Sequence, residues 1–253
     1  MRETVIRLET FYASPLGLAA QSAVKARLST LWTNVAGHNI LGFGYCWPML
    51  NSYTKTANRV VLAMPAGQGA LAHANQRGVM TCLTEDDRLP FSDATFDHIL
   101  CVHAIEEAAH VPTLLRELWR VTRPEGRIVI VASNRAGLWS RSEKVPFGSG
   151  RPYSKTQLRA VLTQAGFQPT VSSNALYVPP MTRLAKPRIA RGFEQFGEVV
   201  WPSFSGLVLV EAIKRLYAEP GSVERGLVRR PSFGASPVAN PVANPLGDTQ
   251  NER

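Results

Sequence analysis

Two groups of side chains in this sequence are suited to chemistry. His103 stands at the end of an apolar segment, residues 96–105, where an imidazole can serve as a general base. The alternative is a polar strand-end residue with a backbone partner. In "FGSGRPYS" (147–154) a glycine-rich turn presents Arg151 and Tyr153, a pair able to hold an anionic group. The alternative there is a loop that only starts the next helix.

A glycine turn is the third candidate site. The stretch "NILGFGYCWPML" (39–50) begins with apolar, strand-like residues, continues through Gly42 and Gly44, and then has helix-forming residues. Glycine at such a turn lets the backbone approach a ligand closely. Cys46 stands two residues after Gly44. The pattern therefore indicates a ligand cradle in which one position carries a side chain.

The remaining acids, histidines and cysteines predict no metal site. Glu106 and Glu107 lie beside His103, but their spacing with His110 matches no metal-binding pattern, and a helix N-terminus favours such an acidic pair. The three cysteines, at positions 46, 82 and 101, form no Cys-x-x-Cys pair. We therefore expect neither a disulfide nor a zinc site, and interpret the cysteines as buried small apolar residues.

Seven strands and three helices are expected to position these residues. Short apolar runs predict strands, and apolar residues repeating at helical spacing predict helices. The expected strands are 39–44, 58–64, 78–83, 96–105, 127–133, 167–178 and 204–215, and the expected helices are 16–32, 111–122 and 155–166. Alternating strands and helices imply a mostly parallel sheet with helices on both faces. The fold class expected is a single doubly wound, Rossmann-like α/β domain.

Length and composition agree with one large domain. The chain has 253 residues, 45% of them hydrophobic. No apolar run reaches the roughly 18 residues that a membrane span needs, and residues 1–21 lack a secretory signal pattern, so we expect a cytoplasmic protein. We expect residues 1–217 to form the domain, with a core at 38–178, a basic insert at 179–202 and a last strand at 204–215. The repetitive segment 218–253 is expected to be a disordered tail.

Residues 89–134 carry the pattern of a known family. They contain Leu-Pro-Phe, an acidic turn, Phe-Asp at the start of a strand, and a helix with Leu-x-Glu-x-x-Arg-Val before a proline–glycine turn. This segment resembles class I S-adenosylmethionine-dependent methyltransferases of the type 11 group, although Glu125 replaces one glycine of the turn. Residues 152–167 are similar to a further helix of that family. The matched motifs are fold markers more than activity markers.

The resemblance implies S-adenosylmethionine as the cofactor, with Gly42 and Gly44 beside its methionine part. It also implies an acid near adenine, for which Glu85 and Asp86 are candidates. The acid that should bind the ribose is replaced by Met64. Charge-assisted hydrogen bonds contribute about 1.5–3 kcal/mol each, so this loss weakens binding by roughly ten- to a hundredfold.

The resemblance places His103, Arg151 and Tyr153 on the acceptor side, with His103 also at the cofactor. The chain has a net charge of +9, and residues 134–191 hold ten basic residues against one acid. That excess favours an anionic partner, either a small molecule or an acidic protein surface, or is only a solvated face. No nucleic-acid module is evident. Two functions follow: methyl transfer to an anionic acceptor, or a catalytically silent methyltransferase fold that binds a protein through its basic C-terminal third.

Overall fold

A seven-stranded sheet forms the centre of the described structure. The computed structural model describes residues 2–75, 78–201 and 204–216. The strands are ordered β5-β2-β1-β6-β7-β9-β8, and only β9 runs antiparallel to its neighbours. Their bounds are β1 Asn39–Gly44, β2 Arg59–Pro65, β5 Thr81–Thr84, β6 Phe96–Val102, β7 Thr122–Ser133, β8 Phe167–Ala175 and β9 Leu207–Lys214. The expected α/β fold class, with its mostly parallel sheet, is confirmed.

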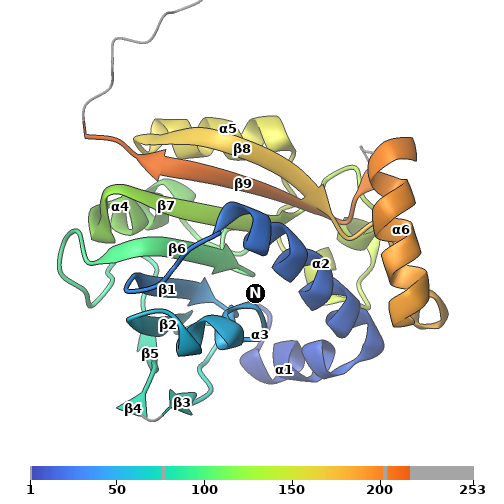
Figure 1. The fold of residues 1–253 in the computed structure, drawn as a ribbon, viewed down its shortest axis with the longest axis horizontal. Coiled ribbons are helices and arrows are strands. Elements are labelled where there is room, and N and C mark those ends of the chain that lie inside the picture. Colours follow the sequence, from blue (N-terminus) through green and yellow to red (C-terminus); the bar gives the residue numbers. More distant parts are fainter. Residues whose placement is uncertain (1, 76–77, 202–203, 217–253) are drawn as a thin grey trace, which may run out of the picture. The chain divides into compact units, whose positions relative to one another are not determined.

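Helices cover both faces of this sheet. One face is packed by α1 (Val5–Ala13), α2 (Pro15–Leu31) and the short α3 (Trp47–Leu50), and the other by α4 (Val111–Val121) and α5 (Lys155–Gln164). In Figure 1 the first group lies in front of the sheet and α4 and α5 lie behind it. The central strands are apolar and buried on both sides, as a doubly covered parallel sheet requires.

Local signals account for the helix starts. The Ser14 hydroxyl accepts from the Gly17 amide at 3.2 Å and Pro15 opens α2, a combination suited to a first turn. The expected capping box at α5 is present, because Ser154 and Gln157 bond each other's backbone amides. Neither helix α1 nor α6 (Pro187–Val200) was expected from the sequence.

Several expected elements need correction. The strand expected at 96–105 ends at Val102, and the one expected at 204–215 runs from Leu207 to Lys214. The expected strand 78–83 is divided: Gly78–Val79 (β4) pairs with Ala74–Asn75 (β3) in a separate hairpin, and β5 begins at Thr81. The strand expected at 167–178 ends at Ala175. Residues 123–126 form an irregularity within β7, because Phe96 pairs with Thr122 and His98 with Arg127. Short 3-10 helices among the described residues include Asn51–Lys55, Trp139–Arg141, Pro146–Gly148 and Thr182–Leu184.

The described helices include none that is both long and apolar enough to cross a membrane. The expected tail, 218–253, lies outside the described residues.

Candidate active site at the carboxyl edge of the sheet

The glycine turn lies where β1 and β6 end together. Gly44 pairs with Val102 across these strands, and its φ is +84°. A Cβ at Gly44 would lie 2.2 Å from the Val102 carbonyl oxygen, and one at Gly42 would lie 2.7 Å from the Cβ of Cys46. Both positions therefore require glycine because the chain's own atoms approach so closely.

Cys46 points beneath the turn. Its thiol donates to the carbonyl oxygens of Phe43 at 3.2 Å and Leu100 at 3.3 Å. Burial raises the pKa of this thiol well above its usual range, so the side chain is a neutral packing group. The position that departs from the family pattern is thus filled by a residue that supports the turn from within.

His103 follows β6 with a φ of +52°, a strained conformation for a residue with a side chain. Its Nε2 lies 3.0 Å from the Tyr12 hydroxyl, and its carbonyl accepts from the Gln68 amide at 3.2 Å. Its ring centroid is 4.3 Å from that of Phe147. Burial lowers the pKa of His103 to about 3, so the imidazole is neutral in its hydrogen bond with Tyr12.

Helix α1 covers this edge of the sheet. Tyr12 on α1 stacks on Tyr45 of the glycine turn, with ring centroids 5.6 Å apart. The segment before the helix is held by an ion pair between Arg2 and Asp86. The Val5 amide donates to the Gln68 carbonyl at 2.8 Å.

Glu3 adds two further ties. Its backbone amide donates to the Glu107 carboxylate at 2.9 Å, and its carboxylate accepts from the Ser149 hydroxyl. The N-terminal segment therefore bridges the loops that follow β5, β6 and β7.

The polar groups under α1 are buried and incompletely paired. Glu106 accepts from the Ser133 amide through Oε1 at 3.0 Å, while its Oε2 has no partner among the described residues. Burial raises the pKa of Glu106 to about 7. Gln68 Oε1 and Arg2 Nη1 also lack partners there. We name Arg2, Tyr12, Gln68, His103 and Glu106 the covered cluster.

The residues expected to bind the cofactor lie in different environments. Met64 is fully buried near the end of β2 and packs in the core beneath α1 and α2. Glu85 is exposed, whereas Asp86 is half-buried. Burial raises the pKa of Asp86, and the Arg2 guanidinium opposes that rise. Of the two acids, Asp86 thus lies at this edge with its charge already compensated.

Arg151 and Tyr153 lie on the other side of the sheet from His103. Tyr153 packs with the core shared by α4 and α5, whereas His103 contacts Tyr12 and Phe147 of the opposite core. Arg151 and Tyr153 line a cavity of about 850 Å³ beside α4 and α5. The structure therefore does not bring the three expected acceptor-side residues together.

Sequence reasoning missed the role of α1. Nothing near Tyr12 in the sequence indicates that it stacks on Tyr45, because the contact joins distant parts of the chain. The positions of Arg2 and Gln68 depend on the same packing. Glu106 was interpreted as a residue favoured by a helix N-terminus, but α4 begins only at Val111, and burial beside Ser133 is its actual setting.

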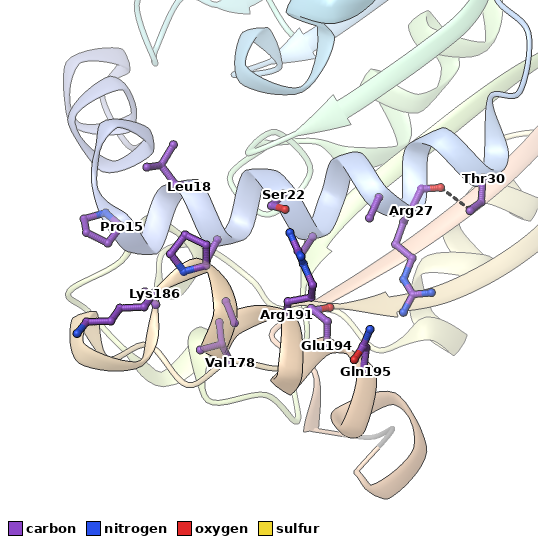
Figure 2. Close-up of a pocket in the computed structure, with 16 residues that line it drawn as sticks. Pro15, Leu18, Ser22, Arg27, Thr30, Val178, Lys186, Arg191, Glu194 and Gln195 are labelled. Carbon is purple, nitrogen blue, oxygen red and sulfur yellow. Dashed lines mark hydrogen bonds between the residues drawn. The ribbon is translucent and has the colours of Figure 1, made fainter.

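A second cavity, about 780 Å³ in volume, lies between α2 and α6. Figure 2 shows Arg191 reaching from α6 toward α2, with Arg27 on the opposite wall. Apolar residues such as Leu18, Ala23 and Val178 also line it.

Comparison with known proteins identifies the central part of the chain. The family model described as a methyltransferase domain matches residues 41–130, which run from β1 into β7. Residues 41–130 therefore match a methyltransferase domain, and the fold is that of S-adenosylmethionine-dependent methyltransferases. Solved structures share the fold: a methyltransferase of Thermotoga maritima, described as S-adenosylmethionine-dependent and possibly a histamine N-methyltransferase, aligns with a TM-score of 0.58 at 16% identity, covering 82% of this chain and 94% of its own.

Curated relatives of this methyltransferase domain match over shorter stretches. A malonyl-[acyl-carrier protein] O-methyltransferase of Erwinia pyrifoliae is 35% identical over 71 residues, 27% of each chain. A demethylmenaquinone methyltransferase of Streptomyces griseus is 31% identical over 129 residues, 48% of this chain and 51% of the relative. The chain thus spans from about a quarter to about half of the length of these relatives.

The methyltransferase domain implies S-adenosylmethionine as cofactor, and the arrangement of α1 conflicts with that cofactor. Gly44, Met64 and His103 are all buried, and Tyr12 lies against Tyr45 and His103, where the resemblance places the cofactor. Met64 offers only a weak thioether acceptor for ribose hydroxyls. With α1 in this position, the residues present do not fit the cofactor.

Proposed function

We propose that this chain is an S-adenosylmethionine-dependent methyltransferase whose cofactor edge is covered by its own helix α1. The covered cluster is the observation that carries the proposal. Among the described residues, buried polar atoms on Gln68 and Glu106 have no partner, at the sheet edge where the glycine turn lies; Arg2, which also has such an atom, belongs to the segment that ties α1 down. Such atoms are costly in a folded protein, and a polar ligand that replaced α1 would give them partners.

Helix α1 is held over the edge by the burial of Val5, Leu8, Phe11 and Tyr12 in the core and by several polar ties. The polar ties are the Arg2–Asp86 ion pair, the Tyr12–His103 hydrogen bond and the contacts of Glu3. If cofactor and α1 compete for one place, the apparent dissociation constant equals the intrinsic one divided by the open fraction. A weaker tie therefore gives tighter apparent binding.

The acceptor is proposed to be anionic. Two cavities have cations at their walls: Arg116 and Arg151 beside α4 and α5, and Arg27 and Arg191 between α2 and α6. Fixed cations raise the local concentration of an anionic substrate.

Calorimetric titration with S-adenosylmethionine and S-adenosylhomocysteine tests the proposal. The unmodified chain should bind weakly, and Tyr12→Phe should lower the apparent dissociation constant by about three- to tenfold, because one hydrogen bond contributes about 0.5–1.5 kcal/mol. Tyr53→Phe, on the half-buried ring beside Trp32, is the matched control and should leave the constant unchanged. Absence of heat from all three proteins at millimolar ligand, with unshifted melting temperatures, contradicts the proposal.

A second function is favoured by Met64 and the position of Tyr12. Both fill the place of the cofactor with apolar or aromatic groups, as a catalytically silent fold would. In that case the chain acts by binding a partner through its basic C-terminal third. The same titration separates the two functions, since a silent fold stays unresponsive when α1 is loosened.

A further inference from the structure

Helix α6 and the nearby residues Trp201 and Phe204 expose several large apolar side chains. Ile189, Phe196 and Val200 lie seven and four residues apart, on one side of the helix. Trp201 and Phe204 lie beyond the helix end. Phe196 is 73% exposed, and Trp201 and Phe204 are each 60% exposed. Large apolar groups scattered singly are normal on a surface, but a contiguous group of them marks an interaction site.

These exposed apolar side chains do not lie on the side of α6 that packs against the domain. A different side of α6 docks on the domain, through the small residues Ala190 and Gly197, and a Cβ at Gly197 would lie 2.4 Å from the Tyr177 ring. The Glu194 carboxylate fixes the same side by accepting from the backbone amides of Leu176 and Tyr177, at 3.2 and 2.7 Å. The helix is therefore held firmly while its apolar side faces outward.

Positive charge gathers at the start of α6, where Arg183 and Arg188 are exposed, while Lys186 and Arg191 line the cavity toward α2 (Figure 2). The segment 181–193 contains no acidic residue, and its four cationic side chains are all exposed: Arg183, Lys186, Arg188 and Arg191. Within the described residues none of the four side chains forms an ion pair or hydrogen bond. Their charge is thus left for an external anionic partner.

We propose that α6, together with Trp201 and Phe204, binds the surface of an anionic lipid bilayer. A helix that lies in a membrane interface places Phe, Trp and aliphatic side chains among the lipids while Lys and Arg meet the headgroups. Trp is favoured at that depth because its ring is apolar and its N–H is polar. The combination of aliphatic Ile189 and Val200 with these cations distinguishes the surface from a nucleic-acid site, which would use aromatic rings for stacking.

Vesicle binding by the full chain tests this proposal. Co-sedimentation is measured with vesicles of phosphatidylcholine alone and with vesicles containing phosphatidylglycerol. We expect binding only to the second kind, with affinity falling as salt is raised, because headgroup attraction is screened. Bromine-labelled lipids should quench the fluorescence of Trp201, and the Trp201→Phe variant should lose that part of the quenching.

Paired variants separate the apolar and the charged contributions. Phe196→Ser with Trp201→Ser, and Arg183→Glu with Arg188→Glu, should each reduce vesicle affinity at least tenfold. Leu83→Ser on β5 and Arg88→Glu after β5 are matched exposed controls and should leave affinity unchanged. All these side chains are at the surface, so thermal melting should show folded proteins throughout.

Three results would overturn the proposal. One is failure of the unmodified chain to bind anionic vesicles. Another is an equal loss of binding in the two control variants. The third is binding of an RNA oligonucleotide or a purified acidic protein, abolished by the arginine changes, without any binding to vesicles. Vesicle binding needs no S-adenosylmethionine, so its outcome is independent of the cofactor titration.

Discussion

Two polar clusters on opposite sides of the sheet differ in how completely they are paired. Beside α4, Arg120 donates to Glu117, to Asp93 and to the carbonyls of Phe91 and Leu89. The Leu89 amide donates back to Glu117 at 2.9 Å. We name this group the α4 latch. The covered cluster beneath α1 instead leaves buried polar atoms on Arg2, Gln68 and Glu106 unpaired.

This difference separates residues that hold the fold from residues that are suited to function. A fully paired cluster stabilises one arrangement, whereas unpaired buried groups are retained at a cost in stability. The motifs that resemble the methyltransferase family lie largely in the α4 latch. The departures from the family, Cys46 and Met64, lie near the covered cluster. Agreement with the family motifs therefore indicates the fold, whereas the activity depends on the residues near the covered cluster.

The largest effect on stability is expected at Gly44, in the glycine turn where β1 and β6 end. Gly44→Ala should lower the free energy of unfolding by about 2–5 kcal/mol, combining about 1–2 kcal/mol for left-handed backbone with about 1–3 kcal/mol for overpacking against Val102. Urea denaturation measures the change. Gly192→Ala is the control, since a Cβ added at Gly192 would have no atom within 4 Å, and it should be neutral or stabilising. Equal changes in stability in the two variants would show that the close approach of Gly44 to the Val102 carbonyl oxygen is unimportant.

The covered cluster should make stability depend on pH through Glu106. Its pKa is about 7 when folded, against 4.5 for the ordinary group, so the folded state keeps a proton that the unfolded state releases. The free energy of unfolding should therefore fall as pH rises from about 4.5 to 7, by about 1.4 kcal/mol per unit and about 3 kcal/mol in all.

Glu106→Gln isolates this contribution. The variant should lack the decline, so the difference between variant and unmodified chain should grow over this range and stay constant above pH 7. The pKa of His103, lowered by burial, acts in the opposite direction, because the unfolded state binds a proton there between about pH 3 and 6.5. The contribution of His103 is the same in both proteins, so it cancels when the free energy of unfolding of one is subtracted from that of the other. A difference independent of pH would show that Glu106 is ionised in the folded state.

The α4 latch should respond to mutation through stability alone. Glu117→Ala removes the acceptor of the Leu89 amide and the main partner of Arg120, and should cost about 1–3 kcal/mol in urea denaturation. Asp93→Asn, at a side chain that is 78% exposed, should cost below about 1 kcal/mol. Neither change should alter the apparent affinity for S-adenosylmethionine. An altered affinity would show that the α4 latch and the covered cluster act together in cofactor binding.

The sequence was sufficient to predict the fold but not the covered edge. Periodicity located β1, β2, β6 and α4 because their burial follows a local pattern, and the capping box located the start of α5. Helix α1 was missed because its anchors, the Arg2–Asp86 pair and the Tyr12–Tyr45 stack, join residues distant in the chain. Gly42 and Gly44 were correctly singled out, but the chain's own close packing already requires glycine at both.

A small effect on cofactor affinity is expected at Cys46, which departs most visibly from the glycine pattern. Its thiol points toward the Phe43 and Leu100 carbonyls beneath the turn, not toward α1. Cys46→Gly should therefore restore the pattern without restoring space for a cofactor. We expect the apparent affinity for S-adenosylmethionine to change by less than about twofold, with a loss of about 1 kcal/mol of stability from the added backbone freedom and the lost packing. Because Tyr12→Phe acts from the other side of the turn, tighter binding in Cys46→Gly than in Tyr12→Phe would show that Cys46, and not α1, limits access to the site.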